Sequence, residues 1–298
     1  MRGAELTQFL DELVSRIQTY VDSSERSDEK AVEFLNANSR MKSTDLILPL
    51  EGRGSQSILD DIDNFLRQCV KTNRPEFMNP LWGGLNIAGF AGEVIAALTN
   101  QSMYTYELSP IATLIEKAII ERMMEIVGYS EGFGTLTTGG SNGNMLGMLC
   151  ARQAINPMST LTGFDGSKYV AFVSSEAHYS ALMSANVIGI GHQNLIKVSC
   201  DTKGRMKPES LIEEISRAVA NDQVPFCIIA TSGTTVRGAF DPLKEIARIA
   251  HDNNIWLHVD AAWGGSCLFS KRHRVLMDGI ELADSMCWDA HKMMGLPL

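Results

Sequence analysis

The chain has 298 residues, of which 45% are hydrophobic and 20% charged, and its formal net charge is −9. This composition is typical of a globular protein with one large or two small domains, and the acidic balance argues against a nucleic-acid partner, because phosphate binding needs a basic surface. Six scattered cysteines without a CxxC pair predict reduced thiols, no metal site and a cytoplasmic location. No apolar run has the length of a membrane-spanning helix and the acidic, amphipathic start is unlike a secretory signal, so we expect no membrane partner.

Residues 1–75 are charged and helical in pattern, and we expect them to form an N-terminal helical segment. An aromatic and glycine-containing loop follows, "RPEFMNPLWGGLN". A helix is then predicted for "SPIATLIEKAIIERMMEIVGY", where Ser109 is the expected N-cap and Pro110 the first helical residue. Isoleucine and leucine recur on one face of this segment, which is the pattern of an amphipathic helix.

From about residue 135, short apolar strands alternate with amphipathic helices. The expected strands are "KYVAFVSSE", "LIKVSC", "FCIIAT" and "IWLHVD", and the expected helices are "MLGMLCARQAI", residues 178–187, "PESLIEEISRAVAND" and "DPLKEIARIAHDNN". This alternation predicts an α/β fold with a mostly parallel sheet that is covered by helices. We assign residues 76–298 to this large domain.

Polar residues stand where several of these strands end, and ligands of parallel sheets collect at the carboxyl ends of the strands. Asp260 closes "IWLHVD", Thr231 closes "FCIIAT", and His178 follows "KYVAFVSSE". Each has a structural interpretation beside the functional one. The aspartate could cap the next turn, the threonine could be a turn hydroxyl, and a histidine at this position is more often hydrogen-bonded than catalytic.

The segment "TGGSNGN" stands directly before a helix and could hold an anion, because helix N-termini present unpaired N–H groups. It is neither a Walker loop nor the dinucleotide fingerprint. A tight turn that needs positive φ is the simpler interpretation of its glycines.

Lys292, in "CWDAHKMMG", lies among apolar residues. A buried lysine there would have a lowered pKa and a nucleophilic amine, although a surface lysine is the more common outcome. Together, an amine, an acid, an anion site and small flanking residues at the ends of strands match the needs of one cofactor, pyridoxal 5′-phosphate.

The ordered motifs "TGGSNGN", "SSEAHYS", "ATSGTT", "HVDAAWGGS" and "DSMCWDAHKMMGLPL" resemble the group II pyridoxal-phosphate-dependent amino-acid decarboxylases, of the glutamate, cysteine-sulfinate and aromatic type. The resemblance covers roughly residues 70–298. It implies the large domain of a fold-type I transferase-like enzyme.

The resemblance also implies roles for individual residues. Lys292 would form the Schiff base with the cofactor, Asp260 would pair with the ring nitrogen, and His178 and Ala262 would flank the two faces of the ring. Thr231 would lie near the ring and the substrate-derived group.

The phosphate would be held by Gly140, Ser141 and Asn142, with help from His291. In this family two subunits build each site, so the resemblance implies a homodimer.

Two departures from the family pattern concern the substrate and the end of the chain. Asn79-Pro80 stands where an asparagine–glutamine pair is usual in the substrate loop, and Trp82 is bulkier than the small residue typical of glutamate enzymes, which favours a shorter acid. Family members continue well past the lysine, so the chain is expected to be truncated, without the C-terminal small domain.

The sequence therefore predicts a carboxy-lyase of amino-acid metabolism that converts an acidic L-amino acid (glutamate, aspartate or cysteine sulfinate) to an amine and CO₂. Two alternatives stay open. One is another fold-type I enzyme, such as an aromatic or diaminobutyrate decarboxylase or a lyase. The other is a truncated, catalytically inactive binding or regulatory form.

Overall fold

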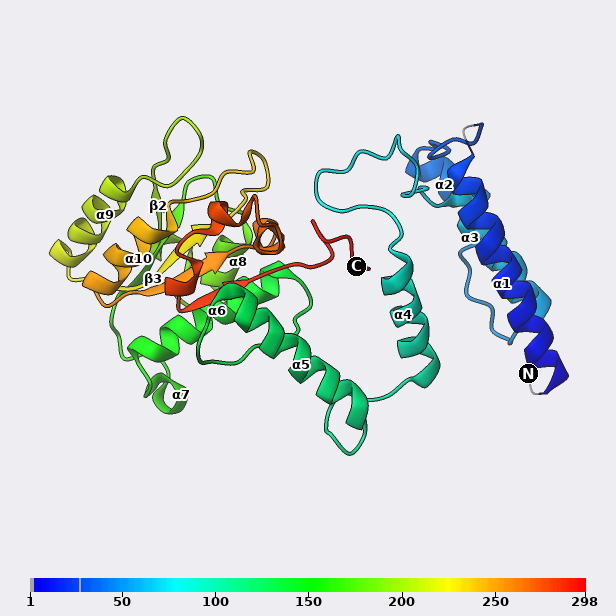
Figure 1. Cartoon of the computed structure of the whole chain (residues 1–298), viewed down its shortest axis with the longest axis horizontal. Coiled ribbons are helices and arrows are strands. Elements are labelled where there is room, and N and C mark those ends of the chain that lie inside the picture. Colours follow the sequence, from blue (N-terminus) through cyan, green and yellow to red (C-terminus); the bar gives the residue numbers. More distant parts are fainter. Residues whose placement is uncertain (1–2, 27) are drawn as a thin grey trace. The chain divides into compact units, whose positions relative to one another are not determined.

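The computed structural model describes residues 3–26 and 28–298, and these form two compact units (Figure 1). The first unit ends at Ile87 and the second comprises Ala88–Leu298. The sequence suggested a boundary at residue 75, between a helical segment and the large domain. That boundary stays a prediction. Among the described residues, the structure contains no helix that is both long enough and apolar enough to cross a membrane.

The first unit is built from charged helices. Its helices are α1 (Ala4–Glu25), α2 (Ala37–Ser43) and α3 (Ser55–Gln68). Helix α1 packs against α3, and Arg16 Nε lies 3.0 Å from Asp63 Oδ2 across this contact. Leu59 of α3 is buried in the same unit.

Two apolar helices precede the sheet, α4 (Ile87–Thr99) and α5 (Pro110–Val127). Pro110 is the first helical residue of α5, as predicted. Ser109 precedes it, but its hydroxyl donates to Gln101 Oε1 at 2.8 Å and does not cap the helix. Much of the apolar face of α5 is solvent-exposed.

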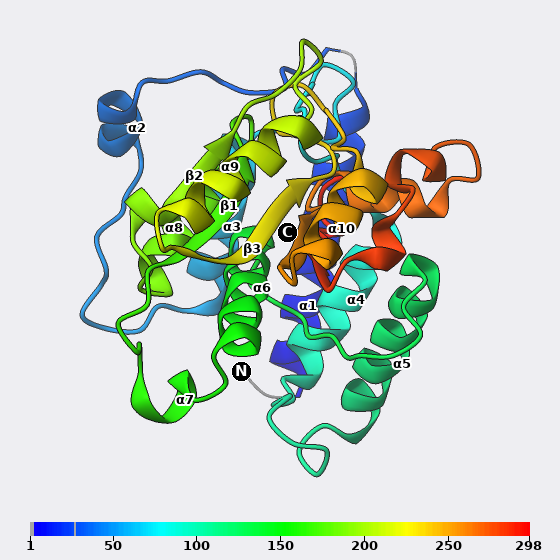
Figure 2. The same cartoon turned by 90° about the vertical axis from the view of Figure 1, so that its left-hand side faces the viewer.

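The second unit contains a five-stranded sheet in the order β2-β1-β3-β4-β5, and every neighbouring pair is parallel. Figure 2 shows the part of the sheet formed by β2, β1 and β3. The strands are β1 (Tyr169–Ser174), β2 (Leu195–Val198), β3 (Val224–Thr231), β4 (Trp256–Asp260) and β5 (Ser285–Cys287). The helices of this unit after α5 are α6 (Gly140–Ile155), α7 (Ser159–Thr162), α8 (Ser180–Val187), α9 (Pro208–Ala220) and α10 (Leu243–Asp252), with short 3₁₀ helices at His192–Asn194, Gly264–Phe269, Arg274–Met277 and Ile280–Leu282. The predicted parallel α/β sheet is confirmed.

Both faces of the sheet are covered, because successive side chains of a strand point to opposite faces. Val170 and Phe172 of β1 belong to the core that includes α9 and α10. Ala171 and Val173, the residues between and after them, belong to the core that includes α6 and α8. Each large apolar side chain buried in this way contributes about 1.5–3 kcal/mol, which explains why the strands are apolar at nearly every position.

Helix α6 lies unusually close to β4 and β5 because one of its faces is made of glycine. Gly140, Gly143 and Gly147 recur at the three- and four-residue spacing of one helix face. A methyl group on Gly143 would lie 2.7 Å from Cys287 Cβ, and one on Gly147 would collide with the imidazole of His258. Any larger residue at these three positions would hold helix α6 further away from the strands.

We predict that Gly147→Ala lowers the free energy of unfolding by about 1–3 kcal/mol, because a methyl group forced into a packed contact strains its neighbours. Urea denaturation measures this change. Gly92→Ala is the matched control, since Gly92 in α4 has open space where the methyl group would lie; it should be neutral or stabilising by up to about 1 kcal/mol. Equal effects of the two substitutions would contradict the close-approach argument.

Candidate cofactor site

The predicted site residues of the second unit gather at the carboxyl edge of the sheet. In the register of the parallel strands, Thr231 of β3 is the neighbour of Asp260 in β4, and Asp260 is the neighbour of Cys287 in β5. The loops that follow β1, β4 and β5 carry His178, Ala262, His291 and Lys292, and the first turn of α6 carries Gly140, Ser141 and Asn142. The topology therefore brings together residues that are up to 152 positions apart in the chain, from Gly140 to Lys292.

Asp260 is 7% exposed, and both of its carboxylate oxygens accept hydrogen bonds. Oδ1 accepts from the backbone N of Ala262 at 3.1 Å, so the interpretation as a turn cap is correct. Oδ2 accepts from Asn144 Nδ2 at 2.9 Å. An ionised carboxylate has about four acceptor positions, so the structural role leaves capacity for a further donor such as a protonated ring nitrogen.

His178 lies half-buried between β1 and α8, where its Nδ1 accepts from the backbone N of Ser180 at 3.2 Å. Burial lowers the pKa of His178, and the Lys292 ammonium lowers it further, while the carboxylates of Asp260 and Asp289 act in the opposite direction. The backbone N of Asp289, the partner of Lys292, donates to Ala262 O at 3.1 Å, so the predicted amine and the predicted acid lie on neighbouring turns at this edge.

Thr231 is 3% exposed and is held through its backbone N, which donates to Asp241 Oδ2 at 2.7 Å. Its hydroxyl oxygen is buried and has no hydrogen-bond partner within the described part of the chain, and the same is true of the hydroxyl of Ser232. An unpaired buried hydroxyl is costly. A ligand at this edge would satisfy it.

The glycine-rich segment forms both a tight turn and a helix N-terminus. Gly139 has φ 123°, which only glycine adopts readily. The backbone N–H groups of Asn142 and Gly143 already donate to Gly139 O, at 2.9 and 3.1 Å. The amides of Gly140 and Ser141 precede these first helical bonds and therefore offer donors to an anion.

Lys292 is partly buried. Its side chain is 23% exposed, and its Nζ lies 2.9 Å from Oδ2 of Asp289, a carboxylate that is 6% exposed. His291 Nε2 lies 3.9 Å from the same oxygen. The turn after β5 thus supplies a buried partner for the amine of Lys292.

Asn79 and Trp82 belong to the first unit, so their predicted contact with substrate stays a prediction. Asn79 Oδ1 accepts from the backbone N of Leu81 at 2.8 Å and of Trp82 at 3.4 Å, which organises the turn around Pro80. The Trp82 ring packs against Phe77, with 6.1 Å between ring centroids.

Sequence reasoning missed two residues of the site, Asn144 and Asp289. Asn144 is the last residue of the "TGGSNGN" motif, one helical turn past Gly140, and this spacing could have placed it under the strand ends. Asp289 precedes Lys292 by three positions, the spacing of a helical ion pair, but the two residues between them gave no sign that the chain turns there.

The residues of this edge fit pyridoxal phosphate. They supply an amine at Lys292, a carboxylate with spare acceptor capacity at Asp260, helix amides at Gly140 and Ser141, and an unpaired hydroxyl at Thr231. Within residues 3–26 and 28–298, no group of three His, Cys, Asp or Glu side chains is arranged to hold a metal ion.

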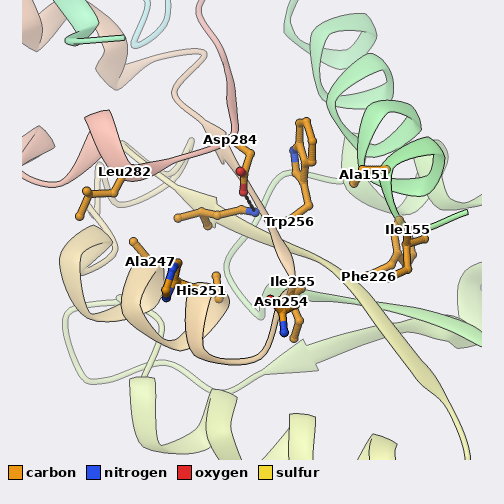
Figure 3. A pocket seen from close by; sticks show the side chains of 13 residues that line it. Ala151, Ile155, Phe226, Ala247, His251, Asn254, Ile255, Trp256, Leu282 and Asp284 are labelled. Atoms are coloured by element: carbon orange, nitrogen blue, oxygen red, sulfur yellow. Dashed lines mark hydrogen bonds between the residues drawn. The ribbon is translucent and has the colours of Figure 1, made fainter. Parts of the chain in front are cut away.

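A cavity of about 340 Å³ lies at the opposite edge of the sheet, where β3 and β4 begin (Figure 3). Phe226, Trp256 and Ile155 line it, and Asp284 at its rim accepts a hydrogen bond from Leu257 N at 2.7 Å. None of the predicted site residues lines this cavity.

Comparisons with known proteins agree with the geometry. Residues 38–298 match the family model of the pyridoxal-dependent decarboxylase conserved domain. The chain is 39% identical over 313 residues to an acidic amino acid decarboxylase of Mus musculus, covering 98% of this chain and 57% of that protein. It is 40% identical over 273 residues to the cysteine sulfinic acid decarboxylase of Mus musculus, covering 91% of this chain and 55% of that protein.

Among solved structures, the crystal structure of mouse CSAD matches with a TM-score of 0.95 at 37% identity, covering 98% of this chain and 63% of that chain. The predicted fold of a fold-type I decarboxylase is confirmed. The chain spans about half the length of the curated relatives that it matches.

The carboxylate of Asp289 lies beside the N-terminus of α6, since a methyl group on Gly140 would be 2.7 Å from its Oδ2. A phosphate bound to these amides would meet a like charge. We therefore predict that Asp289→Asn tightens the binding of pyridoxamine phosphate, which has the phosphate but no aldehyde to react with Lys292, by about three- to tenfold, as expected for one like-charge contact near a protein surface.

Isothermal titration calorimetry measures this affinity. Asp284→Asn, at the opposite edge of the sheet, is the control and should bind as the wild type does. Weaker binding by Asp289→Asn would show that the carboxylate supports the site instead of opposing the phosphate.

Proposed function

The chain belongs to the pyridoxal-dependent decarboxylase family, and from this premise we propose that it decarboxylates an acidic L-amino acid to the corresponding amine and CO₂. One observation carries the proposal. The amine of Lys292 pairs with Asp289 at 2.9 Å, the backbone N of Asp289 donates to Ala262 O at 3.1 Å, and Ala262 N donates to Asp260 Oδ1 at 3.1 Å, all at the carboxyl edge of the sheet. An amine and an acid at one site are what the cofactor of this family requires.

Pyridoxal phosphate, when bound, accepts the electron pair that loss of CO₂ leaves on the substrate α-carbon. In our proposal the amine of Lys292 would hold the cofactor through its aldehyde group. Asp260 would accept a hydrogen bond from the ring nitrogen and so keep a proton on it, which would stabilise the developing charge. His178 and Ala262 would flank the ring.

The phosphate would be held by the amides of Gly140 and Ser141, by the side chains of Ser141 and Asn142, and by His291. Thr231 would direct its unpaired hydroxyl to the ring or to the group derived from the substrate. The buried, unpaired state of that hydroxyl among the described residues supports this role.

The acidic substrate class is supported by two relatives, an acidic amino acid decarboxylase and a cysteine sulfinic acid decarboxylase. The assignment of Asn79 and Trp82 to the substrate loop belongs to the same proposal. The bulk of Trp82 favours aspartate or cysteine sulfinate over the longer glutamate.

We also propose a cytoplasmic homodimer. The exposed apolar face of α5 supports it, since Ile111, Leu114 and Ile115 are 62%, 50% and 51% exposed and a second subunit would cover such a face. The six cysteines, all within the described residues, are free thiols, in keeping with a reducing compartment.

We predict that borohydride reduction of the chain with pyridoxal phosphate attaches the cofactor at Lys292 and that Lys292→Ala removes both the visible absorbance band and the modified peptide. Mass mapping of the digest identifies the site. The control is Lys244→Ala, which removes an exposed lysine that pairs with Asp278 at 2.7 Å. Modification of another lysine in the wild type would remove Lys292 from this role.

A second prediction concerns the substrate. In an assay of CO₂ release from a panel of L-amino acids, we expect aspartate and cysteine sulfinate to react faster than glutamate, and aromatic amino acids to react slowest. Preference for glutamate would reverse the argument from Trp82, and preference for an aromatic substrate would exclude the acidic class.

A further inference from the structure

A chain of hydrogen bonds connects the carboxylate of Asp260 to the indole of Trp256 through three side chains. Asn144 Nδ2 donates to Asp260 Oδ2 at 2.9 Å, and His258 Nε2 lies 2.9 Å from Asn144 Oδ1. His258 Nδ1 lies 2.8 Å from Ser285 Oγ, and that oxygen accepts from Trp256 Nε1 at 2.8 Å. Asn144 and His258 are 2% and 1% exposed, so water does not compete for these bonds.

The amide of Asn144 fixes the direction of the whole chain of bonds. Its Nδ2 donates to Asp260, so its Oδ1 faces His258 Nε2, and an amide oxygen can only accept. The proton of the neutral ring therefore lies on Nε2, and His258 donates to Asn144 Oδ1. His258 Nδ1 then accepts from Ser285 Oγ, which itself accepts from Trp256 Nε1.

The environment keeps His258 neutral, as this arrangement requires. Burial lowers its pKa to about 4, although Asp260 acts in the opposite direction. Gly147 of α6 packs directly against the imidazole of His258, so the ring has little freedom to rotate.

The amide of Asn144 is oriented from both ends. Its Oδ1 also accepts from Cys287 Sγ at 2.9 Å, and its Nδ2 also donates to Ser180 Oγ at 3.0 Å. A rotated amide would direct its oxygen at the carboxylate of Asp260 and its NH₂ group at the N–H of His258. Both contacts are repulsive, so one orientation is selected.

We propose that Asn144 is a positioning residue for Asp260, and that His258 and Ser285 hold Asn144 in the orientation in which it donates. A hydrogen bond to a carboxylate favours its charged form. Asn144 thereby holds Oδ2 of Asp260, so that the remaining acceptor positions of the carboxylate are directed to the ring nitrogen of the cofactor. This inference rests on the proposed function, because it concerns the acid assigned to that nitrogen.

The first experiment needs no cofactor. Long-range ¹H–¹⁵N NMR of the ¹⁵N-histidine-labelled chain should show His258 neutral, with its proton on Nε2 and a hydrogen-bonded Nδ1. Ser285→Ala should shift the Nδ1 signal to that of a free imine nitrogen, and Ser285→Thr should restore it. The control is Ser266→Ala, since Ser266 Oγ accepts from Trp288 Nε1 at 3.1 Å in the same way but does not contact His258.

The second experiment reads the ring nitrogen of ¹⁵N-labelled pyridoxal phosphate bound to each variant. We expect a protonated nitrogen in the wild type and in Ser266→Ala, partial loss of the proton in Ser285→Ala, and the largest loss in Asn144→Leu. In parallel, kcat of Asn144→Leu should fall about tenfold or more, the effect of losing a hydrogen bond to a charged group, with KM little changed.

The possible outcomes test the proposed function and the positioning role of Asn144 separately. A wild-type chain that binds no cofactor would overturn the proposed function and the positioning role with it. A bound cofactor whose ring nitrogen is unchanged in Asn144→Leu and Ser285→Ala would overturn the positioning role alone, as would a His258 that carries its proton on Nδ1. If Asn144→Leu does not fold, the Ser285 variants decide the question.

Discussion

The close approach of helix α6 to strands β4 and β5 sets the geometry of the whole carboxyl edge of the sheet. Three glycines on one helix face remove the side chains that would hold the elements apart, and the first turn of the helix therefore lies against Ala262 and Asp289. The same approach places the amide of Asn144 within hydrogen-bond distance of Asp260. An anion site at the helix N-terminus and an oriented acid at the strand end are consequences of one packing contact.

Two buried aspartates at this edge are given different roles by their partners. Asp260 accepts from neutral donors, the amide of Asn144 and the backbone of Ala262, which leaves its charge available to a ligand. Asp289 is paired with the ammonium of Lys292. In the proposed reaction the carboxylate of Asp260 faces the ring nitrogen. The carboxylate of Asp289 lies near the phosphate and near the amine of Lys292, so its negative charge opposes the binding of the phosphate.

Most of the sheet could be predicted from the sequence, because buried parallel strands are apolar at nearly every position and are separated by amphipathic helices. The strand β5 was not predicted. It has three residues, and "SMC" is too short to show the hydrophobic periodicity of a strand. The glycines of "TGGSNGN" were interpreted through backbone conformation, which is correct for Gly139, whereas Gly140 and Gly143 are needed for close packing, a property of the neighbouring strands that the local sequence does not contain.

Site residues at strand ends were predictable because a parallel topology places those ends together. The partners that orient them were not, since the contacts of Asn144 with His258 and Asp260 span 114 and 116 positions. The burial of Lys292 could not be decided from the sequence, because apolar neighbours in sequence need not be apolar neighbours in space. The ion pair with Asp289 shows the difference.

The most direct measurement is a crystal structure of the chain soaked with pyridoxal phosphate. The account predicts the ring nitrogen within hydrogen-bond distance of the Asp260 carboxylate and the aldehyde carbon at Nζ of Lys292. A cofactor bound instead in the cavity between Phe226 and Trp256, or bound with its ring nitrogen away from Asp260, would contradict it.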